Sequence, residues 1–115
     1  MDQPHAVEQI GPEVAVRLLA QGATMIDVRE PDEWKLGRAP QSLHIPLGDL
    51  DARLSELPTD RKLIMICRSG GRSNTAAAAL VDKGLNAVNL AGGMKAWKAA
   101  SLPVVADGGV AGDVA

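Results

Sequence analysis

The 115-residue sequence contains no phenylalanine or tyrosine, two tryptophans and a single cysteine. So few aromatic side chains argue against the stacking surfaces that bind single-stranded nucleic acid. The formal net charge is only −2, so no basic field steers the chain to nucleic acid or to anionic lipid. A single cysteine excludes a disulfide within the chain and is typical of a reducing compartment. We therefore expect no nucleic-acid partner and no membrane partner.

Membrane segments and metal ligands are also missing from the sequence. No apolar run approaches the length of a membrane span, and residues 1–11 lack the apolar stretch of a secretory signal. The two histidines, His5 and His44, lie far from Cys67 in the sequence, so the spacing offers no set of metal ligands. We expect a cytoplasmic protein that needs no metal and no cofactor.

The length predicts one small domain with an aliphatic core, since 46% of the residues are apolar and almost none is aromatic. Residues 1–10 are expected to be a flexible N-terminus and residues 11–106 the folded domain. Residues 107–115 are rich in glycine, alanine and valine, with no helical or strand period. We expect this tail to be disordered.

Helical and strand patterns alternate along the chain. Strands are predicted over residues 24–28, 43–45, 62–66 and 87–90, and helices over 12–21, 31–36, 50–57, 73–83 and 93–100. The four apolar residues Leu63-Ile64-Met65-Ile66 predict a central strand that is covered on both faces. Alternation of this kind indicates an α/β fold, in which helices cover both faces of a parallel sheet.

The only cysteine lies between the central strand and the following helix. The segment reads Ile66-Cys67-Arg68-Ser69-Gly70-Gly71-Arg72-Ser73. The paired glycines can adopt positive φ and turn successive N–H groups toward the sulfur, and the helix adds its positive end. Such surroundings lower the pKa of a thiol and favour the reactive thiolate. A lone cysteine after an apolar strand is more often an inert core residue. The two arginines and the paired glycines favour a nucleophile here.

The number of residues between Cys67 and Arg72 indicates which reaction the loop favours. Cysteine-dependent phosphatases have five residues between the cysteine and the arginine, whereas four separate Cys67 from Arg72. A shorter loop makes a tighter ring of N–H groups, which suits one sulfur atom attached to Cys67 better than a phosphate. The segment Cys67-Arg68-Ser69-Gly70-Gly71-Arg72-Ser73 resembles the active-site loop of the rhodanese family of sulfurtransferases.

Two further segments resemble signatures of the same family, so the resemblance covers about residues 12–105. The N-terminal signature is matched by Ile26-Asp27-Val28-Arg29-Glu30-Pro31-Asp32-Glu33-Trp34, and the C-terminal one by Ala91-Gly92-Gly93-Met94-Lys95-Ala96-Trp97 with Leu102-Pro103-Val104. This chain departs from the family at Gly37-Arg38-Ala39-Pro40-Gln41-Ser42, where the family often has Gly-His-Ile-Pro-Gly-Ala. The resemblance implies a rhodanese-like α/β fold with a central, mostly parallel five-stranded sheet.

The resemblance also implies a reaction and roles for the residues. Cys67 would take a sulfane sulfur from a small anionic donor such as thiosulfate and become a persulfide. The acceptor would be cyanide, a small thiol or a protein cysteine. The N–H groups of residues 68–73 would hold the negative charge. Arg68 would either attract the anionic donor at the entrance to the loop or be an ordinary solvated arginine. Arg72 would brace the loop by pairing with a carboxylate such as Asp27.

The remaining residues of the signatures have structural alternatives. Asp27 and Arg29 either line the site or form a structural pair at the end of their strand. Trp34 and Trp97 are expected to fill the core, and Gly92 and Gly93 to form the turn into the last helix. Two other functions stay open: a non-catalytic rhodanese-like binding or regulatory module, and a phosphatase or arsenate reductase on the same fold.

Overall fold

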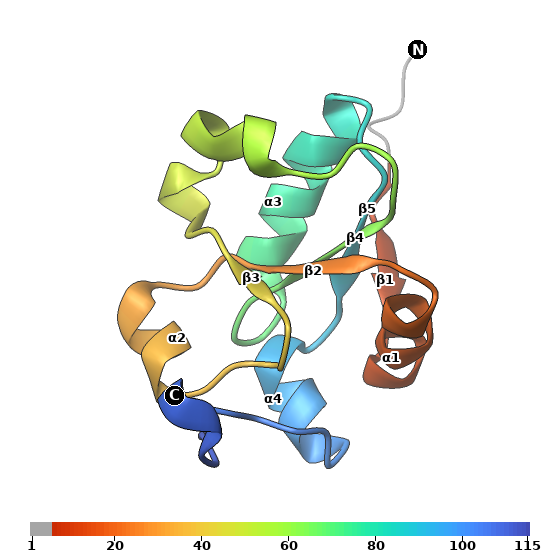
Figure 1. The fold of residues 1–115 in the computed structure, drawn as a ribbon. Helices are drawn as coiled ribbons and strands as arrows, with labels where there is room; N and C mark the ends of the chain where they lie inside the picture. The colour runs from red at the N-terminus through yellow and green to blue at the C-terminus, as the bar shows by residue number, and fades with distance from the viewer. Residues whose placement is uncertain (1–5) are drawn as a thin grey trace.

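The computed structural model describes residues 6–115, and His5 lies outside them. One sheet has the strand order β1-β5-β4-β2-β3, and all its neighbouring strands are parallel (Figure 1). The strands are β1 (Glu8–Ile10), β2 (Thr24–Asp27), β3 (Leu43–His44), β4 (Leu63–Ile66) and β5 (Ala87–Leu90). The helices are α1 (Pro12–Ala20), α2 (Pro31–Leu36), α3 (Gly71–Asp82) and α4 (Gly93–Ala99). This confirms the predicted α/β fold with a five-stranded parallel sheet.

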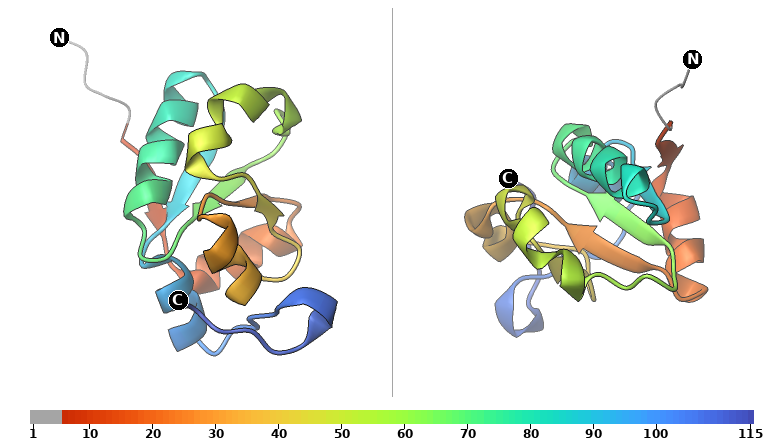
Figure 2. Two further views of the ribbon diagram at one scale, coloured as in Figure 1. Left: turned by 90° about the vertical axis from the view of Figure 1, so that its left-hand side faces the viewer. Right: turned by 90° about the horizontal axis from the view of Figure 1, so that it is seen from above.

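The central strand β4 separates two hydrophobic clusters. Leu63, Met65 and Cys67 point to one face, where the helix α3 packs along β4 and β5 (Figure 2). Ile64 and Ile66 point to the other face and belong to the cluster that includes residues of α1 and α4. All four residues of β4 are buried, as the apolar run predicted. Within residues 6–115, no helix has the length and apolar character needed to span a bilayer.

The strand β1 was not predicted, because its three residues include the polar Glu8 and Gln9 and show no clear period. The structure pairs it in parallel with β5, with Ile10 opposite Leu90, and buries Ile10 in the second cluster. An edge strand of this length is specified by its neighbour rather than by its own sequence. The structure thus places Glu8–Ile10, the last three residues of the N-terminus expected to be flexible, in the sheet.

The helix predicted over residues 50–57 is instead made of 3-10 turns. They are η1 (Leu47–Asp49) and η2 (Asp51–Glu56), and Arg53 breaks the second with φ −114° and ψ 19°. Leu50 and Leu57 are still buried in the first cluster, as their spacing predicted. The segment keeps its apolar face although its backbone is tighter than an α-helix.

The tail was predicted to be disordered, but the structure packs it against the domain. After the turn η3 (Asp107–Gly109), the Gly112 N–H donates to the Val104 carbonyl at 2.9 Å and the Asp113 N–H to the Leu36 carbonyl at 3.1 Å. Val114 packs against the second cluster. The two hydrogen bonds use the backbone, so they require no particular side chains and leave no period in the sequence.

The two tryptophans have different environments. Trp97 is buried, as predicted, and its Nε1–H donates to the Pro103 carbonyl at 2.7 Å. The prediction that Trp34 fills the core is wrong: it is only partly buried and stacks on His44 with ring centroids 4.7 Å apart. The guanidinium of Arg38 lies 4.7 Å from the centre of the Trp34 ring. Arg38, at the position where the family often has histidine, is thus one layer of this stack.

Candidate active site

Cys67 follows β4 directly and lies at the carboxyl edge of the parallel sheet, where ligands bind in such folds. The short loop Arg68–Gly70 connects it to α3, which begins at Gly71. The residue is only 1% exposed, because its side chain points toward the cluster under α3. The predicted order of strand, thiol, glycine loop and helix is confirmed.

Two polar groups lie within hydrogen-bonding distance of the sulfur. The Gly70 N–H donates to Cys67 Sγ at 3.1 Å, and the Ser73 hydroxyl lies 3.3 Å from the same atom. Gly70 has φ +106°, a left-handed conformation that turns its N–H inward and favours glycine. A side chain at Gly70 would also bring a Cβ within 3.1 Å of the Gly92 nitrogen. The loop therefore requires glycine for its shape and for its packing.

Opposing effects set the pKa of Cys67. Burial raises it, since a buried thiolate loses its hydration. Hydrogen bonds from the Ser73 hydroxyl and from the N–H groups of Ser73, Gly70 and Ser69 lower it by more. The net pKa of Cys67 is below its ordinary value, which favours the nucleophilic thiolate.

Arg72 braces the loop, but its partner is Glu33 and not Asp27. The guanidinium pairs with both carboxylate oxygens, Nη1 to Oε1 at 2.7 Å and Nη2 to Oε2 at 2.8 Å. Glu33 Oε1 also accepts the Glu30 N–H at 3.0 Å, in a capping box at the start of α2. These bonds, foremost that from Arg72, lower the pKa of Glu33 from 4.5 to about 2. The pair links α2 to the first turn of α3.

Asp27 and Arg29 form the structural pair that the sequence left as one alternative. Both side chains are fully buried, and Arg29 Nη2 lies 2.8 Å from Asp27 Oδ2 and 2.7 Å from the Gly37 carbonyl oxygen. Within residues 6–115, no hydrogen bond or ion pair joins them to the loop after Cys67. The pair holds the end of β2 to the end of α2. The same part of the chain contains no group of three or more His, Cys, Asp or Glu able to hold a metal ion.

The helix α4 supports the loop from the opposite side. Its first N–H groups bind the loop carbonyls: Met94 N–H donates to Cys67 O at 2.8 Å and Lys95 N–H to Arg68 O at 3.0 Å. Gly93 allows this approach, since a Cβ there would lie 2.4 Å from the Cys67 oxygen. The turn predicted at Gly92 and Gly93 is present, and it also fixes the backbone of Cys67.

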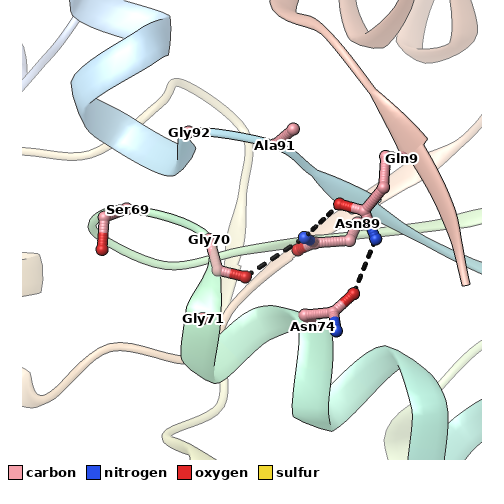
Figure 3. Close-up of a pocket in the computed structure, with 8 residues that line it drawn as sticks. All are labelled: Gln9, Ser69, Gly70, Gly71, Asn74, Asn89, Ala91 and Gly92. Atoms are coloured by element: carbon pink, nitrogen blue, oxygen red, sulfur yellow. Dashed lines mark hydrogen bonds between the residues drawn. The ribbon is translucent and has the colours of Figure 1, made fainter.

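Arg68 is exposed beside the loop, and its Nε donates to the backbone oxygen of Ala115. A pocket of about 390 Å³ lies next to the loop, and Cys67 is not among the residues that line it (Figure 3). Its lining consists of Gln9, Ser69, Gly70, Gly71, Asn74, Asn89, Ala91 and Gly92. The sequence prediction missed Gln9, Asn74 and Asn89. The one available signal was Asn89, a polar residue inside the otherwise apolar strand Ala87–Leu90.

Comparison with known proteins agrees with this geometry. Residues 12–100 match the rhodanese-like domain family, so the chain belongs to that family. It is 42% identical over 86 residues to a sulfurtransferase of Allochromatium vinosum, covering 74% of this chain and 80% of that protein. It is 34% identical to the thiosulfate sulfurtransferase GlpE of Pseudomonas syringae, covering 79% and 87% of the two chains. The crystal structure of a rhodanese-related protein from Thermoplasma volcanium superposes with a TM-score of 0.80 at 34% identity, covering 85% and 97%.

Proposed function

We propose that this protein is a sulfurtransferase that moves a sulfane sulfur from thiosulfate, or a similar anionic donor, to cyanide or a thiol. One observation carries the proposal: the sulfur of Cys67 lies within hydrogen-bonding distance of Gly70 and Ser73, just before α3 begins, and the pKa of this thiol is lowered. The relatives that are named sulfurtransferases support the same reaction class. We expect the protein to act in the cytoplasm.

The reaction would proceed in two displacements. The Cys67 thiolate attacks the outer sulfur of thiosulfate, a sulfur–sulfur bond forms, and sulfite leaves with the electron pair of the broken bond. The acceptor then attacks the terminal sulfur of the persulfide and releases the Cys67 thiolate. Cyanide would leave as thiocyanate, and a thiolate acceptor would leave as a persulfide.

The loop would stabilise the charge in both steps. The Gly70 N–H already binds the sulfur at 3.1 Å, and the N–H groups of Ser69 and Ser73 favour its negative charge. Arg68 is exposed beside the loop, where its guanidinium would attract the anionic donor. Because Cys67 is the only cysteine of the sequence, its persulfide has no internal thiol to attack it. The sulfur would therefore leave to an external acceptor, either a small thiol or a partner protein's cysteine.

The test is intact-mass measurement after incubation with thiosulfate. Wild-type protein should gain the mass of one sulfur atom, and cyanide or dithiothreitol should remove it. Cys67→Ser should gain nothing, because it lacks the only thiol. Transfer of sulfur by folded Cys67→Ser would show that Cys67 is not the carrier.

The same samples separate the alternatives. A folded wild type whose Cys67 reacts with iodoacetamide but never gains sulfur would favour a binding or regulatory module. Hydrolysis of p-nitrophenyl phosphate, or reduction of arsenate, would favour the phosphatase or arsenate reductase reaction. The four-residue spacing between Cys67 and Arg72 argues against these two reactions.

A further inference from the structure

A buried chain of hydrogen bonds leads from the nucleophile into the sheet. Ser73 Oγ lies 3.3 Å from Cys67 Sγ and 2.6 Å from Asn89 Oδ1. Asn89 Nδ2 in turn donates to the Gly70 carbonyl at 3.1 Å and to Gln9 Oε1 at 2.8 Å (Figure 3). Ser73 is 0% and Asn89 2% exposed, so water does not replace these bonds. The chain joins β1, β5, the loop and α3.

The orientation of the Asn89 amide follows from its partners. The Gly70 carbonyl can only accept a hydrogen bond, so the Asn89 NH₂ group must face it. The carbonyl oxygen of Asn89 is then left to face Ser73, and it can only accept as well. The Ser73 hydroxyl therefore donates its proton to Asn89 Oδ1, over the short distance of 2.6 Å.

A serine hydroxyl has a single proton, and it cannot donate to Asn89 and to Cys67 at once. While Ser73 donates to Asn89, it presents a lone pair to the sulfur. A neutral thiol suits this arrangement, because its S–H can donate to Ser73 Oγ. A thiolate or a persulfide anion has no such proton, so the hydroxyl must turn from Asn89 to the sulfur to stabilise it.

We propose that Asn89 is a positioning residue that competes with the Cys67 sulfur for the proton of Ser73. Ionisation of Cys67 is then coupled to rotation of one hydroxyl group, and Asn89 stabilises the neutral thiol relative to the anionic sulfur. The N–H groups of the loop favour the anion in either orientation of the hydroxyl. Asn89 thus sets how readily the sulfur ionises, and its effect on sulfur transfer rests on the proposed function.

The charged groups near Cys67 act on its sulfur but take no part in the competition for the Ser73 proton. Arg72 acts on the sulfur through its charge, which Glu33 balances. Asp27 and Arg29 neutralise each other at the end of the neighbouring strand β2, and Arg68 is exposed to solvent. None of these groups hydrogen-bonds to Asn89, whose partners are Ser73, Gly70 and Gln9.

The test is the pH dependence of alkylation of Cys67 by iodoacetamide, which reports the thiolate and does not require sulfur transfer. Asn89→Leu removes the competing acceptor, so the midpoint of the profile should fall by roughly half to one pH unit. Asn89→Asp keeps an oxygen facing Ser73, so its midpoint should stay at or above that of the wild type. In a Ser73→Ala background, Asn89→Leu should leave the midpoint of Ser73→Ala unchanged.

These variants separate the proposal from a merely structural role. If Asn89 only holds the loop through Gly70, both Asn89 variants should raise the midpoint, because the loop N–H groups would lose their positions. The proposal would be overturned if Asn89→Leu failed to lower the midpoint in the protein that has Ser73. It would also be overturned if Asn89→Leu shifted the midpoint in the Ser73→Ala background. Asn89→Ala removes the same acceptor but packs differently, so it should shift the midpoint in the same direction. It tests the proposal independently if the leucine variant does not fold.

The matched control is Thr75→Val, which removes an exposed hydroxyl from the same helix and should leave the midpoint unchanged. Intact-mass measurements on the same variants report sulfur loading separately. A failure of the proton competition can thus be told from a failure of the sulfurtransferase proposal.

Discussion

At the scale of single residues, Glu33 and Arg72 connect α2 to the first turn of α3. The pairing is bidentate, and the side chains are 14% and 38% exposed. A planar guanidinium fits a carboxylate in this way, whereas lysine offers only a point charge. Arg29 also lowers the pKa of Glu33 through its charge, although its own guanidinium pairs with Asp27.

Glu33→Gln should destabilise the protein by about 1–2 kcal/mol at neutral pH, less than for a fully buried pair because Arg72 is partly hydrated. The pKa of Glu33 is about 2 in the folded protein and 4.5 ordinarily, so it is lowered by folding. Its contribution is therefore complete above about pH 5 and is lost as the pH falls toward 2. Urea unfolding at pH 7, 4 and 2.5 should show the difference between wild type and variant shrinking.

The exposed pair of Arg53 and Glu56 provides the control, and Glu56→Gln should change the unfolding free energy far less than Glu33→Gln. A difference for Glu33→Gln that stays constant down to pH 2.5 would mean that the ion pair is not the cause.

At this scale the sequence predicted the surroundings of Cys67 and the bracing role of Arg72, but not the partner of Arg72. Cys67 is the only cysteine of the sequence, and the arginines and glycines follow it directly, so surroundings that favour its thiolate could be predicted from their order alone. Glu33 reaches Arg72 across 39 positions, and several carboxylates follow β2. The position of α2 in the fold determines that Arg72 pairs with Glu33, whereas Asp27 pairs with Arg29.

At the level of whole elements, two backbone hydrogen bonds join α4 to Cys67 and the loop after it. The first N–H groups of α4 bind the carbonyls of Cys67 and Arg68, and Gly93, with φ +56°, lies against them. The loop is thus fixed by a helix that lies on the opposite face of the sheet from α3.

Gly93→Ala should destabilise the protein by about 3 kcal/mol, through an unfavourable φ and through collision with backbone atoms that cannot rotate away. Its Cβ would lie 2.4 Å from the Cys67 oxygen and 2.7 Å from the Arg68 carbonyl carbon. Gly84→Ala is the matched control, because Gly84 has φ +86° and nothing within 4 Å of a Cβ. It should cost only the backbone strain, about 1 kcal/mol. Equal unfolding free energies of the two variants would show that the contact with the loop contributes nothing.

The elements that were predicted well are those whose own composition specifies them. The apolar run of β4 and the helix α3 carry their pattern in their own residues. The strand β1 does not, because its partner strand β5 specifies it. The turns η1 and η2 carry the leucine spacing of a helix, and that spacing does not distinguish a 3-10 backbone from an α-helix.

In the molecule as a whole, the parallel sheet brings the ends of β2, β4 and β5 to one edge, where α2, the loop and α4 follow them (Figure 1). The tail returns across this end of the molecule and contacts α2 and α4. It contacts the backbone of Leu36 through Asp113, whose side chain pairs with Lys98. The tail thus connects two elements that support the active-site loop.

Gly112→Ala should release this tail without unfolding the sheet. A Cβ at Gly112 would lie 2.8 Å from Gly37 Cα and 2.9 Å from the Val105 carbonyl carbon, so the two backbones would have to separate. The Asp113 amide, which donates to Leu36, should lose its protection from hydrogen exchange, whereas the amides of β4 should keep theirs. Gly48→Ala, where a Cβ meets nothing within 4 Å, should change neither. If the Asp113 amide of the wild type already exchanges as fast as in an unfolded peptide, the tail is free in solution, as its composition had predicted.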